Sequence, residues 1–411
     1  MKIESIDLYR LELPLKQTYG PLFNPQTCLY SIFARVGVDG QYGWGEVSLE
    51  QTPRTSQDWA GGAYYAASEL LAPAWIGQKF DLPTDLPKYW DSLRGCESGK
   101  AVLETALLDA CARIKGKPLY EFLAAPVPGG YEAPGSESKS DPVPPQTVYY
   151  PFDQIADFEQ YCKSIEKAIA DGFRFLEIKC RPGWDIMMLN AIRDLTISCR
   201  FHVDFCGALG EEHQDILYRC EDFFPLFLQQ PFDGDDLVLS AMVQESFHTP
   251  FGLTEGINSA RSLEIAADMN AARVFGVNSS LLGGLLKAKE LLGKIRELGA
   301  TAHNWSRLTT GLGARSLQTQ SALAKNTIGQ LSVCYPDTIA LDESGSGVPL
   351  TQYPIPYWKE SDWFVEPLFD DQPTVEFQKA AAVELGTAPG LGVDVDEKRL
   401  EPFVVEHATF E

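Results

Sequence analysis

Charged or polar side chains end a series of short apolar segments, at nearly constant intervals along the chain. The five positions are Lys179, Asp204, Gln229, Thr254 and Asn278. Successive positions are 24 or 25 residues apart, and Glu177 lies two residues before the first of them. A lysine beside carboxylates can act as a general acid or base, and carboxylates also bind hard cations such as Mg²⁺. The set therefore indicates proton transfer or metal binding, provided that the fold brings it together.

Each apolar segment is followed by a helix-like stretch. Short strands that alternate with helices at such an interval are typical of a parallel (β/α) barrel. In this α/β fold the carboxyl ends of the strands form one mouth, and the mouth carries the chemistry. We therefore expect the five positions to converge on one site.

Several of these segments resemble motifs of a known superfamily. They are FLEIKCRPGWD, HVDFCGA, LFLQQPF, FGLTEGINSA and VNSSLLGGLLKA. They are similar to the barrel motifs of the enolase superfamily, in its muconate-lactonizing group, and most similar to those of o-succinylbenzoate synthase and N-succinylamino acid racemase. The resemblance extends to MKIESIDLYRLELPL near the start and PGLGVDVDEKRL near the end. It implies a TIM-like (β/α)7β barrel with an α+β capping domain built from the N-terminal region and the C-terminal tail.

The resemblance also implies where the bases of the family lie. Members usually carry Lys-x-Lys on the second strand and a facing lysine on the sixth, where this chain has Glu177-Ile178-Lys179 and Asn278. Two lysines on one strand lower each other's pKa by repulsion, which provides a neutral amine as base. With Glu177 on the same strand face, Lys179 is expected to stay protonated. We therefore predict that the parental reaction, proton abstraction α to a carboxylate, is lost.

The metal ligands that the resemblance implies are changed as well. Asp204 stands at the first ligand position, but Gln229 and Thr254 replace carboxylates at the other two. Mg²⁺ prefers near-octahedral oxygen ligands, with charged carboxylates supplying most of the attraction. We therefore expect no cofactor, with Mg²⁺ as the alternative, either at this site or at a relocated one using Glu177 and Asp204. Strand alternation predicts that Glu255, adjacent to Thr254, points away from the site.

A small-molecule carboxylate is the ligand that the sequence favours, and local positive charge is needed to hold it. The residues expected to contact it, besides Lys179, are Tyr19, Phe23, Arg181 and Arg307. The two aromatic residues belong to a loop, residues 15–26, that folds over the barrel mouth in the family. His202 shares the strand parity of Asp204, so it should point into the barrel, where we expect a hydrogen-bonded core residue. The cysteines near it lack the C-x2-C spacing that would indicate zinc.

Three functions remain open. The first is a degenerate member of the superfamily that binds a small molecule without the parental reaction. The second is a metal-independent isomerase or lyase, in which Lys179 acts as acid or cation and Glu177 or Asp204 as base. The third is a metal-dependent racemase or synthase with neutral ligands. The first is favoured, because the metal ligands and the bases are lost together.

The predicted domain organisation follows the resemblance. An α+β capping domain spans 1–124, a connecting loop rich in Pro, Gly and Ser spans 125–146, the barrel spans 147–350, and 351–411 returns to the cap with a C-terminal strand. Within the cap, alternation predicts an antiparallel sheet over 2–14 and 29–49 with a turn at Asp39-Gly40. Helices are expected at about 58–75 and 98–115.

Composition excludes several classes of partner. The net charge of −23 argues against nucleic acid and anionic membranes, which need a basic surface. The sequence contains neither a signal peptide nor a run of about 20 apolar residues, so we expect no membrane span. Nine scattered cysteines are typical of reduced thiols in a cytoplasmic protein. The family resemblance also predicts a homo-oligomer.

Overall fold

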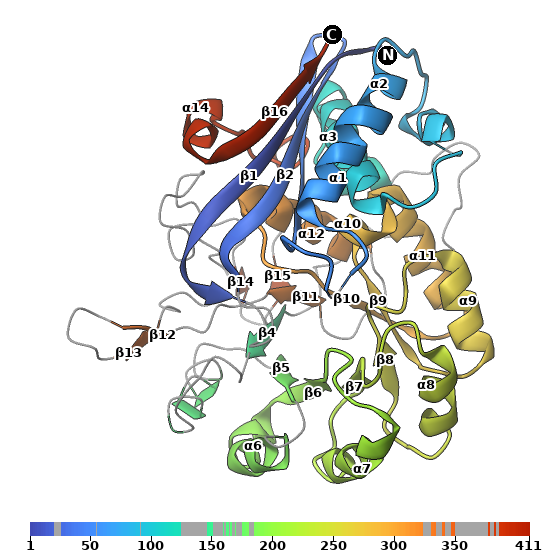
Figure 1. Ribbon diagram of the computed structural model, residues 1–411, viewed down its shortest axis with the longest axis vertical. Helices are drawn as coiled ribbons and strands as arrows, with labels where there is room; N and C mark the ends of the chain where they lie inside the picture. The colour runs from blue at the N-terminus through green and yellow to red at the C-terminus, as the bar shows by residue number, and fades with distance from the viewer. Residues whose placement is uncertain are drawn as a thin grey trace.

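The computed structural model describes most of the chain, with gaps. The described residues are 1–19, 26–54, 56–90, 92–124, 146–150, 159, 162–163, 165–166, 169, 175–180, 185–323, 330–333, 339–341, 347–349, 377–378, 382–383 and 386–411. They form a capping sheet with its helices above a parallel barrel (Figure 1). The domain boundaries drawn from the sequence stay predictions.

The capping sheet is antiparallel, with the strand order β16-β1-β2-β3. Its strands are β1 (Ile3–Tyr19), β2 (Gln26–Val38), β3 (Gln41–Leu49) and β16 (Val404–Phe410). Asp39 and Gly40 both have positive φ, 45° and 76°, as a tight two-residue hairpin turn requires. The predicted turn and C-terminal strand are confirmed. The predicted loop over 15–26 is too long, because the hairpin ladder continues until Tyr19 pairs with Gln26.

The helices α1 (Ala60–Ala66), α2 (Ala72–Trp75) and α3 (Glu97–Ile114) cover one face of the capping sheet (Figure 1). The π-helical segment η1 (Ala67–Leu71) joins α1 to α2, and the 3-10 turns η2 (Pro83–Asp85) and η3 (Pro87–Trp90) precede α3. Helix α4 (Leu119–Ala124) follows α3 and contributes to a separate apolar cluster. The helix α3 packs closely on β3 because Gly43 and Gly45 have no side chain. A Cβ atom at either glycine would overlap the backbone of α3. The two helical segments predicted for the cap are confirmed.

Eight parallel strands form the barrel. They are β4 (Gln146–Tyr150), β5 (Phe175–Lys179), β6 (Arg200–Asp204), β7 (Leu228–Gln229), β8 (Phe251–Leu253), β9 (Val274–Val277), β10 (Thr301–Asn304) and β11 (Gln330–Val333). Their order is β10-β9-β8-β7-β6-β5-β4-β11, and the outer strands β10 and β11 contact each other. The predicted α/β fold, a (β/α)7β barrel with an α+β cap, is confirmed.

Helices connect the barrel strands and surround them (Figure 1). They are α6 (Asp185–Ile192), α7 (Gln214–Glu221), α8 (Leu237–Gln244), α9 (Ala260–Asp268), α10 (Ser279–Leu282), α11 (Leu285–Glu297) and α12 (Gly311–Leu323), with the short turns η5 (Leu195–Ser198) and η6 (Glu211–His213). The described residues between 159 and 169 are also helical. Among the described helices, none has both the length and the apolar composition needed to cross a membrane.

The remaining elements are short. They are β12 (Ile339–Leu341), β13 (Gly347–Pro349), β14 (Phe377–Gln378), β15 (Ala382–Val383), α14 (Glu397–Leu400) and η7 (Glu401–Phe403). β12 pairs with β13 and β14 pairs with β15, both antiparallel. The chain then passes through α14 to β16, which places the C-terminus beside β1 and near the N-terminus (Figure 1).

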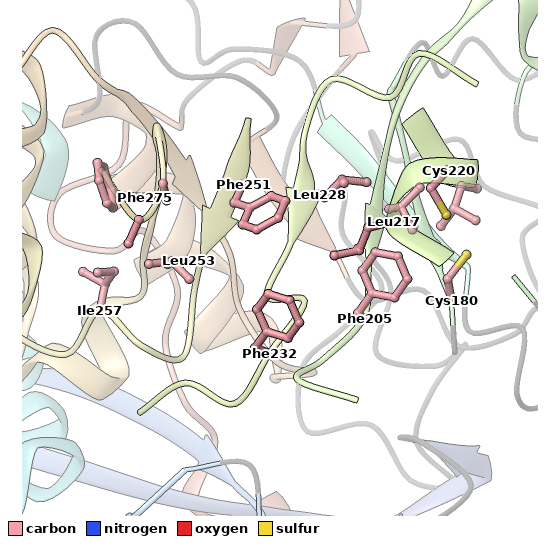
Figure 2. Packing of buried hydrophobic residues seen from close by; sticks show 14 of the residues in the cluster. Cys180, Phe205, Leu217, Cys220, Leu228, Phe232, Phe251, Leu253, Ile257 and Phe275 are labelled. Atoms are coloured by element: carbon pink, nitrogen blue, oxygen red, sulfur yellow. The ribbon is translucent and has the colours of Figure 1, made fainter. Parts of the chain in front are cut away.

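Strand alternation builds the barrel core and positions the site. The residues that directly precede the five predicted positions are all apolar and fully buried: Ile178, Val203, Leu228, Leu253 and Val277. They belong to the cluster between the strands and the outer helices, part of which is shown in Figure 2. Because neighbouring strand residues point to opposite faces, these apolar residues face the helices and the polar ones face the barrel interior.

Candidate site at the barrel mouth

The structure brings Lys179, Glu177 and Asp204 together. Lys179 Nζ lies 3.2 Å from Glu177 Oε1 and makes an ion pair and hydrogen bond with Asp204 Oδ2. It also contacts Cys206 Sγ at 3.0 Å. Both carboxylate side chains are buried, at 5% and 2% exposure, while that of Lys179 is 19% exposed. One ammonium group is therefore held between two carboxylates.

The register of the parallel sheet explains this arrangement. On β5 and β6, Lys179 lies beside Asp204, and Glu177 lies beside His202. In a parallel sheet, residues in register on neighbouring strands point to the same face. The four side chains therefore meet inside the barrel in two layers, with Lys179 and Asp204 nearer the carboxyl ends of the strands.

Burial and charge move the pKa values of the two carboxyl groups in opposite directions. Burial raises the pKa of Glu177, but the Lys179 ammonium and His202 more than offset this and leave it below its ordinary value. Burial also raises the pKa of Asp204, and here Lys179 does not fully compensate because the charge of Glu177 adds to the increase. Glu177 is therefore the firmly ionised partner of the lysine.

Cys206 closes the same cluster. Its backbone N–H donates to Asp204 Oδ1 at 2.9 Å, and its φ is 49°, in the left-handed region. Burial raises the pKa of the Cys206 thiol well above its ordinary value, with a further increase from Asp204. Because only the thiolate is a good nucleophile, this cysteine is unsuited to nucleophilic catalysis.

The other three predicted positions also face the interior, with different partners. Gln229 is buried, and none of the described residues forms a hydrogen bond with its Oε1 atom. The Thr254 hydroxyl donates to the carboxylate of Glu255. Asn278 Oδ1 accepts the backbone N–H of Ser280 at 3.0 Å and so caps α10. The side chains of Thr254 and Asn278 therefore already form hydrogen bonds with neighbouring groups.

The prediction that Glu255 points away from the site is wrong. Burial and the charge of Asp204 raise the pKa of Glu255, and Lys179 acts on it in the opposite direction, so all three are near neighbours. The reason is that β8 ends at Leu253. Strand alternation does not extend into the turn that follows, and Glu255 returns to the mouth there.

A cavity of about 900 Å³ lies between the cap and the barrel mouth. Its barrel wall includes Cys206, Thr254, Glu255, Asn278 and Trp305, and its cap wall is formed from residues 53–54, 56–58 and 95–97. Cavities of this size hold small-molecule ligands. The ionic cluster around Lys179 thus meets the cavity through Cys206 and Glu255.

The predicted ligand-contacting residues are placed only in part. Arg307 lines a smaller cavity of about 30 Å³ together with Asn278 and Glu46. Tyr19 ends β1, but its side chain is outside the described part of the structure, as are Phe23 and Arg181. Their contacts with a ligand stay predictions.

Sequence reasoning missed His303. Ligand atoms of His303, His202 and Glu177 all lie within 4.8 Å of one another, and all three residues are buried. The signal was present, since one further interval of 25 residues after Asn278 leads to position 303 on the next strand, β10. The prediction for His202 was that it points inward and is hydrogen-bonded. It does point inward, but its Nε2 atom has no hydrogen-bond partner in the part of the chain that the structure describes.

Comparison with known proteins identifies the family. The family model described as "Enolase C-terminal domain-like" matches residues 160–399, more than half of the chain. The chain is 29% identical to an N-succinylamino acid racemase from Thermus thermophilus, over 69% of this chain and 73% of that protein. It is 26% identical to an o-succinylbenzoate synthase from Geobacillus stearothermophilus, over 98% of this chain and 96% of that protein.

The fold has close structural relatives. The crystal structure of an N-succinyl Arg/Lys racemase from Bacillus cereus superposes with a TM-score of 0.78 at 18% identity and covers both chains completely. At this identity the likeness concerns the fold. Together with the family match, it shows that the chain belongs to the enolase superfamily, within the group that resembles o-succinylbenzoate synthases and N-succinylamino acid racemases.

Proposed function

We propose that the barrel mouth binds a small molecule and no longer performs the metal-assisted proton abstraction of its relatives. The observation that carries this proposal is the position of Lys179 between Glu177 and Asp204. A lysine must be neutral to act as a general base, and two adjacent carboxylates favour its charged form. Held in this way, Lys179 is a cation rather than a base.

The position at which family members have their facing lysine supports the same interpretation. Asn278 stands there, and an amide has no basic group that could remove a proton from carbon. Its oxygen is also committed to the N-terminus of α10, where it accepts the N–H of Ser280. Neither of the two positions that carry lysine bases in the family thus offers a neutral amine here.

The residues at the three family ligand positions do not fit Mg²⁺. Asp204 is paired with Lys179, the Thr254 hydroxyl is turned to Glu255, and Gln229 offers a neutral oxygen. Mg²⁺ binding relies mainly on charged oxygen ligands. We therefore propose no step that passes through Mg²⁺, although a bound ion stabilises the enolate in this type of chemistry.

We propose that the ligand carries a carboxylate and, in addition, a cationic group. The names of the relatives point to N-succinylamino acids, which contain carboxylates. The described wall of the cavity is acidic, with two cationic residues, Arg54 and Lys287, against six carboxylates. The six are Asp58, Glu97, Asp233, Asp235, Glu255 and Glu290. This balance favours a positively charged end.

A matched pair of ligands tests the proposal. N-succinyl-L-lysine and N-succinyl-L-norleucine have side chains of similar length, but only the first carries an ammonium group. At low ionic strength, calorimetry should show about tenfold tighter binding of the lysine derivative. In D₂O, proton NMR should show no loss of the α-proton signal with saturating Mg²⁺. Mg²⁺-dependent exchange of that proton would overturn the loss of activity and restore the racemase or synthase reading.

The second candidate, a metal-independent isomerase or lyase, is motivated by Asp204. Its raised pKa brings this carboxyl group closer to the range in which a general base operates. The same NMR experiment separates the two candidates. Exchange that persists with a chelator present and disappears in Asp204→Asn would favour the second. The predicted homo-oligomer is also part of the proposal, and light scattering of the purified protein tests it.

A further inference from the structure

A second potential ligand set lies deeper in the barrel than the family's metal positions. Glu177 on β5, His202 on β6 and His303 on β10 each offer one ligand atom, and these atoms lie within 4.8 Å of one another. Their exposed fractions are 4%, 2% and 0%. We propose that these three residues bind one divalent transition-metal ion inside the barrel.

His202 supplies an observation that points to a ligand. Its Nε2 atom is buried, has no hydrogen-bond partner among the described residues, and lies 3.4 Å from Glu177 Oε2. The ring is fixed by stacking on Phe227, with centroids 4.3 Å apart, and by an edge contact with His303 at 5.1 Å. An orphaned buried nitrogen is costly in free energy. A metal ion between His202 and Glu177 would occupy its lone pair.

The two oxygens of Glu177 have different partners. Oε1 faces Lys179 at 3.2 Å, and Oε2 faces His202. A ligating carboxylate is commonly held by a hydrogen bond or ion pair to its other oxygen, which fixes its orientation toward the metal. Lys179 has this position here. The lysine that the proposed function removes from catalysis would thereby orient a metal ligand.

The local charge favours a cation as well. Among the described ionisable groups that interact here, the carboxylates of Glu177, Asp204 and Glu255 stand against the single ammonium of Lys179. Carboxyl groups therefore outnumber ammonium groups around the three ligand residues, and a divalent ion would supply positive charge there. Such compensation is what makes buried charge tolerable.

The ligand types select the metal. Two imidazoles and one carboxylate suit Zn²⁺, Fe²⁺ or Co²⁺, whereas Mg²⁺ prefers oxygen ligands throughout. Zinc ligands lie about 2.0–2.2 Å from the metal, so small side-chain rotations would draw the three atoms together. The site shares no residue with the family positions Asp204, Gln229 and Thr254, and it is independent of whether the mouth retains catalysis.

Cobalt titration tests the proposal directly, because Co²⁺ bound by nitrogen and oxygen ligands has visible absorption bands. The chelator-stripped wild-type protein should bind one Co²⁺ per chain, and Zn²⁺ should displace it while excess Mg²⁺ should not. His202→Gln and His303→Gln should each weaken binding by about 100-fold or more, since even outer-shell changes weaken metal binding by about 10- to 100-fold. The matched control is His248→Gln, which alters an exposed histidine outside the cluster and should bind like wild type.

Two outcomes would overturn the proposal. One is the absence of any cobalt spectrum in the folded wild-type protein, a result that does not depend on whether a variant folds. The other is a spectrum that both His202→Gln and His303→Gln leave unchanged while circular dichroism shows them folded. Asp204→Asn separates this site from the mouth, because it should abolish any Mg²⁺ binding there but retain the cobalt spectrum, with a smaller loss of affinity than either histidine variant.

Discussion

Buried carboxylates occur both at the cap–barrel interface and at the barrel mouth, but their hydrogen-bond and ion-pair partners differ. At the interface, Glu46 accepts the N–H groups of Thr310 and Gly313 at 2.9 and 2.7 Å, near the start of α12. Glu104 accepts those of Leu285 and Leu286 at 2.8 and 2.9 Å, at the start of α11. Each cap carboxylate thus satisfies a barrel helix N-terminus, where the helix dipole favours negative charge.

At the barrel mouth, the buried charged and polar groups are not all paired in this way. Three carboxylates surround one lysine, and the buried polar atoms Gln229 Oε1 and His202 Nε2 have no hydrogen-bond partner within the described ranges of the chain. Unpaired polar groups lower stability and are retained where a ligand completes them. The cap–barrel interface is thus arranged for stability, and the contrast supports the proposal that the mouth binds a ligand.

The largest effect should follow from removing Glu46. Glu46→Ala would leave the buried N–H groups of Thr310 and Gly313 without acceptors, together with the Thr309 hydroxyl that donates to Glu46 at 2.8 Å. We expect the free energy of unfolding to fall by about 3–5 kcal/mol, measured by urea denaturation. A loss below about 1 kcal/mol would refute a stabilising role for this interface.

Lys179→Met should have the next largest effect, because it leaves Glu177 and Asp204 buried without their cation. Breaking a buried ion pair from one side costs about 3–4 kcal/mol. The triple variant Lys179→Met, Glu177→Gln, Asp204→Asn should recover most of that loss, since uncharged replacements of a buried cluster are often neutral. A triple variant as unstable as the single one would show that the mouth cluster is itself a stabilising element.

A smaller effect concerns pH. Burial raises the pKa of Glu104 from 4.5 to about 7, although the N–H groups of Leu286 and Leu285 lower it. Because the folded-state pKa lies above the unfolded one, the folded protein binds this proton more tightly, and protonation stabilises the fold. The stabilisation is complete below pH 4.5 and is lost as the pH rises through about 7.

The wild type should therefore lose about 2–3 kcal/mol relative to Glu104→Gln across that interval. Denaturant unfolding of both proteins at several pH values measures the difference. A difference that does not change with pH would mean that Glu104 is ionised throughout and that the backbone donors outweigh burial.

The smallest effect should come from Asn278. Asn278→Ala removes the acceptor that caps Ser280 N–H in α10, and loss of a helix cap costs about 1 kcal/mol. Asn278→Asp keeps an acceptor and should be close to wild type. If Asn278→Ala leaves stability unchanged but weakens binding of N-succinyl-L-lysine, the residue belongs to the ligand site instead of the helix cap.

The sequence predicted the parts of the fold that depend on local pattern. Intervals of 24 or 25 residues marked the strand ends that carry Lys179 and Asp204, since each strand–helix unit repeats the same length. Alternation placed these side chains inside the barrel. It failed at Glu255, because the strand before it ends at Leu253 and a turn has no alternation to follow.

Contacts between distant segments were beyond such reasoning. Glu46 meets Thr310 across 264 positions, and Glu104 meets Leu285 across 181. The residues around either carboxylate do not identify its partner, because the partner is determined by how the cap packs on the barrel. The 25-residue interval marks position 303, but it does not show that His303 contacts Glu177 and His202. That proximity needs β5 and β10 to face each other across the barrel.

We propose above that the barrel mouth has lost its Mg²⁺ site. Calorimetric titration of the chelator-stripped protein with Mg²⁺ measures this, with the double variant Gln229→Glu, Thr254→Asp as the positive control that restores the family's carboxylates. We expect no saturable binding in the wild type below millimolar Mg²⁺, and a site in the double variant. Submillimolar Mg²⁺ binding by the wild type that Asp204→Ala abolishes would show that the mouth retains its metal site.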